Sequence, residues 1–158
     1  MTRTQKVIRY FIGLTLTIGL SGCAELLPTV PPKPAQGEYL EVEYRKFVSG
    51  VYVDELANKY VKINCTYSST MAGTLPGGYP SQRYMSFLAV SPTYPNITAP
   101  EILNVVVPKD LADMIFALKH GDSITVYGRA VPAVYQRTLG GRSVYKSLIL
   151  QADLIEKK

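Results

Sequence analysis

The sequence predicts a mainly β domain that contains one helix, and three observations lead to this fold class. Apolar and polar residues alternate over 60–68, which is the two-residue period of a strand with one buried face. Glycine and proline divide the sequence around it into short runs rich in β-branched and aromatic residues. One stretch, 110–119, changes to the helical period. The length fits a single domain.

Three strands are expected before the helix, at 60–68, 84–90 and 102–107. The first is the clearest, because its alternate residues are apolar and would share one face: Val61, Ile63, Cys65 and Tyr67. Residues 69–83 are rich in glycine and proline, so a long loop is expected there. An earlier segment, 38–47, also alternates; a strand suits it, although a helix is not excluded.

The helix is expected over 110–119, followed by two more strands. Its apolar residues recur at the spacing of a helix buried on one side: Leu111, Met114, Ile115 and Leu118. Asp110 is the expected N-cap, and His120 with Gly121 supplies the stop. The last strands are expected at 123–131 and 145–155, with a polar loop over 134–146 between them.

The order of strand, strand, strand, helix, strand, strand resembles the OB fold. That fold is a five-stranded Greek-key barrel whose helix lies between the third and fourth strands. Residues 121–129 (GDSITVYGR) and 58–63 (NKYVKI) resemble the fourth and first strands of OB domains, and Gly128 suits a sharply bent strand. The resemblance implies such a barrel over roughly 51–157. Another small β-barrel or a β-sandwich remains the alternative.

The N-terminus has a different character. Arg3, Lys6 and Arg9 precede an apolar run of ten residues, 11–20, which is too short to cross a ~30 Å hydrocarbon core as a helix. Leu20-Ser21-Gly22-Cys23 follows, and here the chain resembles the bacterial lipoproteins. The resemblance implies signal cleavage between Gly22 and Cys23, with lipid on the Cys23 sulfur. The alternative is an ordinary N-terminal helix that happens to hold a cysteine.

Three regions are therefore expected: a signal peptide at 1–22, a lipidated cysteine with a proline-rich tether at 23–37, and the barrel domain at 38–158. Residues 24–37 hold four prolines, which fix φ and favour an extended spacer. At ~3.1 Å per residue such a spacer reaches roughly 40 Å. Multiple acyl chains on Cys23 would make a stable membrane anchor.

Net charge argues against nucleic acid once the signal is removed. The chain has 17 Lys and Arg against 12 Asp and Glu, but three of those bases lie within 1–22. The mature chain therefore carries 14 minus 12, or +2. With Cys23 assigned to lipid, Cys65 has no partner for a disulfide, and its alternating neighbours favour a place in the core. Nucleic acid is not expected as a partner.

The sequence offers no candidate catalytic or metal site, and no cofactor is expected. His120 is the one histidine, and its place suggests capping of the helix C-terminus rather than catalysis. Asp110 and Asp113 suit the helix start, where negative charge is favourable. A zinc site would need several His or Cys ligands. We expect a protein that is not an enzyme.

Binding is the better expectation, because OB folds take ligands on the face of their second and third strands, framed by the first-to-second and fourth-to-fifth strand loops. Aromatic rings near arginines in or beside the loops 69–83 and 134–146 could stack on sugar rings or bases and hold anionic groups. The candidates are Tyr79, Arg83, Tyr84, Tyr127, Tyr135, Arg137, Arg142 and Tyr145. The plainer interpretation is that the tyrosines fill half-buried strand positions and the arginines keep the loops soluble.

The function expected from these features is a non-enzymatic, lipid-anchored protein of the cell envelope whose barrel binds a protein, a glycan or an anionic envelope component. The alternative is a structural or assembly accessory of an outer-membrane complex that binds no small ligand. Ala24, rather than Asp, follows Cys23. By resemblance to Gram-negative lipoproteins this points to the outer membrane, with the domain facing the periplasm.

Overall fold

The computed structural model describes residues 32–93, 102–138 and 142–158, apart from the side chains of Gln36 and residues 134–145. The chain divides into two units, 1–30 and 31–158, and all described residues belong to the second. Its strands are β1 (Leu40–Glu41), β2 (Tyr60–Met71), β3 (Tyr84–Val90), β4 (Leu103–Pro108), β5 (Ser123–Thr138) and β6 (Arg142–Lys157). Its helices are α1 (Tyr44–Val48), α2 (Val53–Leu56) and α3 (Ala112–Phe116), with 3₁₀ turns at Gln36–Glu38, Pro76–Gly78 and Lys109–Leu111.

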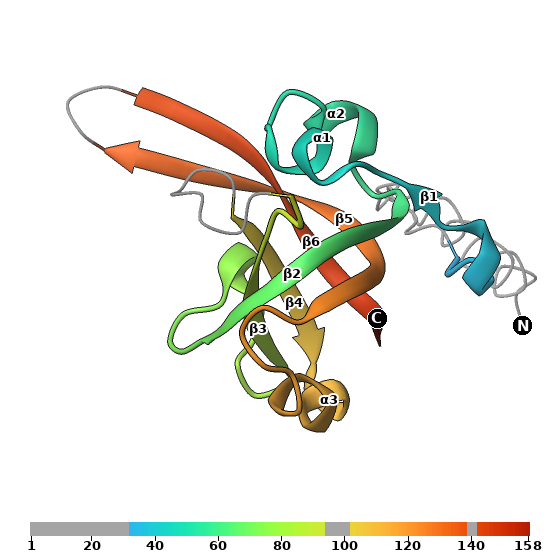
Figure 1. Ribbon diagram of the computed structural model, residues 1–158. Helices are drawn as coiled ribbons and strands as arrows, with labels where there is room; N and C mark the ends of the chain where they lie inside the picture. Colours follow the sequence, from blue (N-terminus) through green and yellow to red (C-terminus); the bar gives the residue numbers. More distant parts are fainter. Residues whose placement is uncertain (1–31, 94–101, 139–141) are drawn as a thin grey trace, which may run out of the picture. The chain divides into compact units, whose positions relative to one another are not determined.

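Five strands close into a barrel in the order β2-β3-β4-β6-β5, and β5 pairs back with β2 (Figure 1). All neighbouring pairs are antiparallel except β4 with β6. The helix α3 lies between the third and fourth barrel strands. This is the connectivity of the Greek-key barrel expected from the sequence. The barrel is an OB fold. The predicted fold class is confirmed, and the alternatives of another barrel or a sandwich are excluded.

The barrel interior is filled by residues at alternate strand positions. The predicted inward face of β2 is confirmed, since Val61, Ile63, Cys65 and Tyr67 all belong to the core cluster. Phe87 and Val105 join them from β3 and β4. Burial raises the pKa of the Cys65 thiol to about 12, so this side chain acts as a small apolar group.

Gly128 lies in β5 at a close approach to the backbone of β6. The register of the two strands shifts between Tyr127 and Gly128, which marks a bulge. A Cβ at Gly128 would overlap the Gln151 carbonyl oxygen and lie 2.8 Å from the Ala152 Cα. The sequence-based expectation of a glycine at the sharply bent strand is therefore confirmed.

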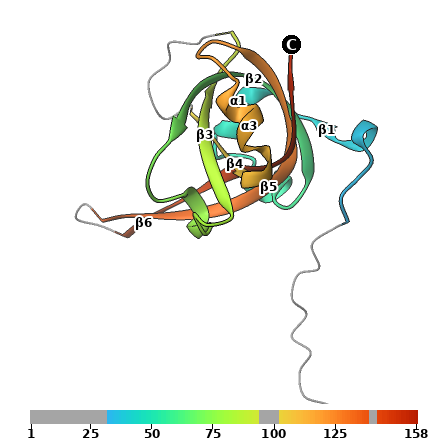
Figure 2. The same cartoon turned by 90° about the horizontal axis from the view of Figure 1, so that it is seen from below.

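The two ends of the barrel are covered by short helices, with α3 at one end and α1 and α2 at the other (Figures 1 and 2). Ile115 of α3 is fully buried, and Leu118 packs against the core. The prediction of one helix over 110–119 was too long, because a 3₁₀ turn precedes a five-residue α3. Met114, expected on the buried stripe, is 41% exposed.

The predicted helix caps were wrong in detail. Asp110 lies inside the 3₁₀ turn, and the residue before α3 is Leu111. The carboxylate that accepts a nearby backbone N–H is instead that of Asp122, 2.8 Å from the Lys119 nitrogen. The ring Nδ1 of His120 lies 2.9 Å from the Ser68 carbonyl oxygen, so the histidine contacts the end region of β2.

The segment expected as a strand at 38–47 is mostly not one. Only Leu40 and Glu41 pair, in parallel, with Val61 and Lys62 of β2. The chain then forms α1, the possibility that the alternating pattern had left open. The reason is burial, because α1 and α2 close the barrel end with Tyr44, Phe47, Val53 and Leu56.

The predicted loop 134–146 is instead the outer part of a long hairpin. Strands β5 and β6 stay paired from Ile124 and Lys157 out to Thr138 and Arg142. Both views show their ends extending away from the barrel (Figures 1 and 2). We call residues 134–138 and 142–146 the arm. Aromatic and β-branched residues such as Tyr135 in β5 and Val144 in β6 suit a two-stranded ribbon.

Candidate functional site

The eight predicted ligand-binding residues fall in separate places. Tyr79 and Tyr84 lie together over the outside of the barrel. Tyr127 lies in a second aromatic group with Tyr39 and Tyr60. Arg83 is exposed, just before β3. The other four belong to the arm, where the backbone register sets Tyr135 opposite Tyr145, Arg137 opposite Ser143 and Arg142 opposite Thr138. Their side chains lie outside the described part of the structure.

Tyr79 and Tyr84 form a small apolar cluster outside the barrel core. Their rings meet edge to face, with centroids 5.0 Å apart, a favourable arrangement for aromatic pairs. Three buried residues complete the cluster: Val106, Ala133 and Ile149. The Tyr79 hydroxyl donates to Gln151 Oε1 at 3.1 Å, and burial raises its pKa. Arg129 Nη2 donates to the same oxygen at 2.9 Å.

Ser86 lies on the same outer face of β3. It shares the alternation of Tyr84 and pairs across the sheet with Val106. Its side chain is fully buried, and its hydroxyl has no hydrogen-bond partner among the described residues. Leaving such a group unsatisfied costs about 1–3 kcal/mol. The outer face of β3 is therefore covered at this position, and one hydroxyl is left unsatisfied among the described residues.

The second aromatic group involves Tyr39, which the sequence analysis did not select. Its ring meets Tyr60 and Tyr127 edge to face, at centroid distances of 5.8 and 5.4 Å. Burial and the nearby Asp153 carboxylate raise the pKa of Tyr39 to about 12. Tyr127 donates to Glu156 at 2.8 Å, and this hydrogen bond raises its pKa. These tyrosines attach β1 to the barrel, in agreement with the plainer interpretation of half-buried strand positions.

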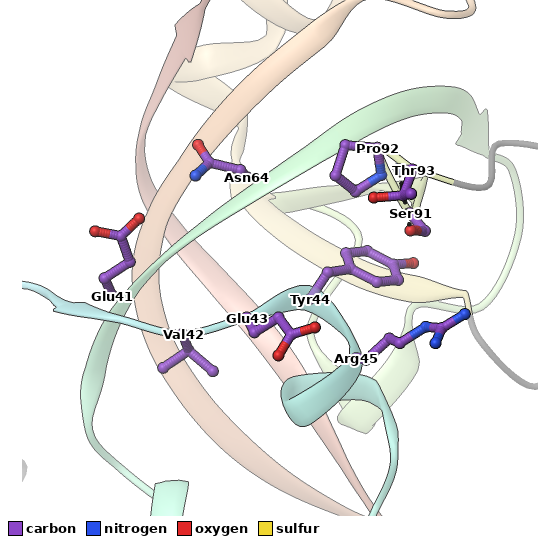
Figure 3. Close-up of a pocket in the computed structure, with 9 residues that line it drawn as sticks. All are labelled: Glu41, Val42, Glu43, Tyr44, Arg45, Asn64, Ser91, Pro92 and Thr93. Atoms are coloured by element: carbon purple, nitrogen blue, oxygen red, sulfur yellow. Dashed lines mark hydrogen bonds between the residues drawn. The ribbon is translucent and has the colours of Figure 1, made fainter.

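A pocket of about 450 Å³ opens beside α1 (Figure 3). Three separate segments form it: the β1–α1 junction, the middle of β2, and the residues just after β3. Figure 3 shows the lining side chains around the Tyr44 ring, with both carboxylates on the side of β1 and α1. The lining residues are Glu41, Val42, Glu43, Tyr44, Arg45, Asn64, Ser91, Pro92 and Thr93.

The pocket presents both hydrogen-bond donors and acceptors. Glu41 is paired with Lys62 at 2.9 Å, which raises the pKa of the lysine. Asn64 Oδ1 accepts from the Thr125 hydroxyl at 2.8 Å, which leaves the amide NH₂ as donor. Ser91 Oγ accepts from the Thr93 backbone N–H at 3.3 Å. Pockets of 300–1,000 Å³ with a few convergent polar groups are typical of small-ligand sites.

Sequence reasoning missed this pocket completely. Its residues come from segments near 43, 64 and 92, and no local motif connects them. The described residues hold no cluster of three or more His, Cys, Asp or Glu that could bind a metal ion. Within the same residues, no helix has the length and apolar character needed to span a bilayer.

No family model matches the sequence, and no curated protein matches it. Solved structures are similar in fold. The S. pombe Stn1-ten1 complex has 13% identity and a TM-score of 0.39, over 63% of this chain and 57% of that one. A putative aspartyl-tRNA synthetase from Leishmania major Friedlin has 14% identity and a TM-score of 0.45, over 82% of this chain and 22% of that one.

A third structure is the mitochondrial single-stranded DNA binding protein Rim1 from S. cerevisiae, with 16% identity and a TM-score of 0.41, over 63% of this chain and 93% of that one. The chain thus spans about half and about a fifth of the first two neighbours. The sequence-based expectation that nucleic acid is not a partner is corrected by this third structure, because a chain of this fold is named as a DNA-binding protein. Nucleic acid belongs among the ligand classes to be tested.

Proposed function

We propose that this chain is a lipid-anchored protein of the cell envelope whose OB barrel binds a glycan in the pocket beside α1. The anchor is supported by the basic residues, the apolar run and the Leu20–Cys23 lipobox. The observation that carries the ligand is the polar pocket of about 450 Å³. By the same resemblance to lipoproteins, Ala24 supports the outer membrane, with the barrel facing the periplasm.

The chemistry of the pocket favours a neutral ligand with many hydroxyl groups. Carboxylates accept hydrogen bonds from hydroxyls, whereas amide and guanidinium groups donate to them. The pocket wall carries all three kinds of group: the carboxylates of Glu41 and Glu43, the Asn64 amide and the Arg45 guanidinium. Two carboxylates, Glu41 and Glu43, would repel a polyanion. A sugar ring offers hydroxyls that are both donors and acceptors, so it matches this mixed lining.

The test is binding of a panel of immobilised neutral oligosaccharides, anionic oligosaccharides and single-stranded DNA. We expect retention on a neutral oligosaccharide and a loss of at least tenfold in Glu43→Ala/Thr93→Val, which is about 1.4 kcal/mol. Glu55→Ala is the matched control, because Glu55 is an exposed carboxylate on α2 that pairs with Lys46 outside the pocket. Equal binding by both variants would refute the pocket as the site.

A second candidate function is binding of an anionic single strand along the arm. The observation that favours it is the composition of the arm, in which Arg137, Arg142 and Lys146 lie near two tyrosines. The tyrosines, Tyr135 and Tyr145, occupy directly opposed register positions. Alternating aromatic and basic residues can stack on bases and neutralise phosphates.

Replacing four arm residues together separates the two candidates. We expect Tyr135→Ala, Arg137→Ala, Arg142→Ala and Tyr145→Ala in one protein to keep the melting temperature within a few degrees. If the arm is the site, retention on single-stranded DNA is lost and retention on the neutral oligosaccharide stays. If both ligands are unaffected, the arm carries neither. A stoichiometric protein complex after mild detergent extraction, with no retained ligand, would instead support an assembly accessory.

A further inference from the structure

Residues 33–42 are fixed to the barrel and do not form a free tether. Tyr39 is 6% exposed and packs against a tyrosine of β2 and one of β5. Its hydroxyl donates to the Asp153 carboxylate at 3.4 Å, and the Lys33 ammonium lies 4.0 Å from the same carboxylate. Strand β1 then pairs with the start of β2 (Figure 1). The spacer expected at 24–37 therefore joins the barrel before its predicted end.

A short length of chain separates this fixed segment from the proposed lipid. Nine residue steps lead from Cys23 to Pro32, the first described residue. Even fully extended, at ~3.6 Å per residue, these steps span roughly 32 Å. That reach is close to the diameter of a small domain, ~30 Å. With lipid on Cys23, the face of the barrel at which the chain arrives therefore stays near the bilayer.

That face carries a shallow groove of about 430 Å³, which we call the tether groove. Most of its lining is apolar, and Leu40 of β1 is 47% exposed. The segment that enters β2 is held in place by β5, because the Asn58 N–H donates to the Ala130 carbonyl at 2.7 Å. The groove is thus a preformed surface. Its lining includes Pro32, Pro34, Leu40, Ala57, Lys59 and Tyr60.

The side chains of the tether groove suit the interface of a lipid bilayer. Its proline, leucine and alanine residues offer apolar surface, and tyrosine is a residue type enriched at membrane interfaces. Lys59 can cover apolar surface with its methylene stem while its ammonium stays in water. Glu38 also lines the groove and offsets the charge of Lys59, so anionic lipid is not required for contact.

We propose that the tether groove is a membrane-contact surface, which lies against the bilayer when Cys23 carries lipid. This inference rests on the proposed lipid anchor. A single acyl chain gives only marginal membrane binding, so this small apolar surface orients the barrel and does not anchor it.

The orientation has a consequence for the pocket beside α1. Leu40 and Glu41 are neighbours in β1, and successive side chains of a strand point to opposite faces. Leu40 lines the tether groove, whereas Glu41 lines the pocket. Contact of the groove with the bilayer therefore turns the pocket away from the membrane, toward ligands in solution.

The full lipidated chain in phospholipid vesicles tests this orientation. The chain contains no tryptophan, so a single introduced indole reports its own surroundings. Leu40→Trp places it in the groove. Phe116→Trp is the matched control, because Phe116 is 70% exposed on α3, at the other end of the barrel from α1 and α2. In vesicles of phosphatidylethanolamine and phosphatidylglycerol with brominated acyl chains, we expect at least threefold stronger quenching of Leu40→Trp.

Flotation with the vesicles separates failure of this inference from failure of the anchor. A parent chain that does not float would overturn the anchor, and this inference with it. If Leu40→Trp floats but is quenched no more than Phe116→Trp, the groove alone is overturned. The groove is also overturned if the indole is shielded from aqueous acrylamide without quenching by the lipid. In that case residues 24–31 or a partner protein cover the groove.

Two aspartate substitutions in the Leu40→Trp background test the apolar contact. Pro34→Asp puts a charge in the groove. Val51→Asp puts the same charge on another apolar position, which is 77% exposed between α1 and α2. We expect Pro34→Asp to lower the quenching at least twofold and Val51→Asp to leave it unchanged. Equal effects of the two substitutions would overturn the groove as the contact surface.

Salt distinguishes an apolar contact from an electrostatic one. Raising the ionic strength from ~0.1 M to ~1 M shortens the Debye length from about 10 to about 3 Å. We expect the quenching of Leu40→Trp to stay unchanged, because Glu38 and Lys59 balance each other in the groove. Loss of quenching at high salt would overturn the apolar contact.

Discussion

Gly128 is the residue that the barrel can least replace. A methyl group there meets two backbone groups of β6, which cannot move without breaking the β5–β6 pairing. We expect Gly128→Ala to lower the free energy of unfolding by about 3 kcal/mol, the upper range for overpacking. Urea denaturation measures the loss. Gly37→Ala is the control, because a Cβ there meets nothing within 4 Å, and a similar loss in both would contradict this explanation.

Asp122 makes stability depend on pH in the acid range. The Lys119 backbone N–H and the Lys157 ammonium, at 2.8 and 2.6 Å, hold the pKa of its carboxyl below the ordinary 3.8. A lowered folded-state pKa contributes stability above the unfolded pKa and loses it as pH falls through the folded one. Asp122→Asn should therefore be less stable than the parent at pH 7, with the difference closing below about pH 3.8. Urea midpoints at pH 7 and pH 2.5 check this, and an unchanged difference would contradict it.

Single positions were predictable where one local constraint decides them. Cys65 alternates with apolar neighbours, and its place in the core was predicted correctly. Gly128 lies in a strand that must bend sharply to close the barrel, and the need for a glycine there was also predicted correctly. Tyr39 was missed, because its partners Tyr60 and Tyr127 come from strands distant in sequence. A tyrosine's partner across a sheet depends on register, which single-residue properties do not encode.

Among the elements, α1 depends on Tyr44. The Tyr44 hydroxyl donates to the Ala89 carbonyl at 2.9 Å and accepts from the Leu103 N–H at 3.1 Å, and so joins α1 to the ends of β3 and β4. Tyr44→Phe leaves both backbone groups unpaired inside the protein. We expect a loss of about 1–3 kcal/mol in the free energy of unfolding.

The control for this prediction is Tyr52→Phe, because Tyr52 is 40% exposed just before α2. Chemical denaturation of both variants measures the difference. If Tyr44→Phe is as stable as Tyr52→Phe, the hydroxyl does not hold α1 to the barrel.

The extents of elements were harder to predict than their existence. The helical period over 110–119 was real, but tertiary packing uses only Ile115 fully and leaves Met114 exposed. Residues 134–146 were predicted to be a loop because Gly140, Gly141 and the polar residues of this stretch are loop-forming in local terms. Pairing of β5 with β6 overrides that preference beyond Val131.

At the scale of the whole molecule, the fold was predictable and the pocket was not. Element order together with the glycine in the fourth barrel strand favoured an OB barrel, and the pairing of β5 with β2 excluded the other barrel and the sandwich. The pocket beside α1 exists because β1 and α1 are packed against β2 and the end of β3. That packing places Glu43, Asn64 and Thr93 in the lining of one pocket, a grouping that no local pattern in the sequence contains.

The lipid anchor is the last prediction, and it separates the two cysteines of the chain. Cys23→Ser removes the sulfur that the lipobox presents, so we expect the protein to move from the membrane fraction to the soluble fraction. Multiple acyl chains anchor stably, and their loss leaves nothing in the described domain that resembles a membrane-spanning helix. Cys65→Ser is the matched control, the same substitution at a buried position. It should stay in the membrane fraction, with a lower melting temperature because a hydroxyl enters the core. A Cys23→Ser protein that remains with the membrane would refute the anchor.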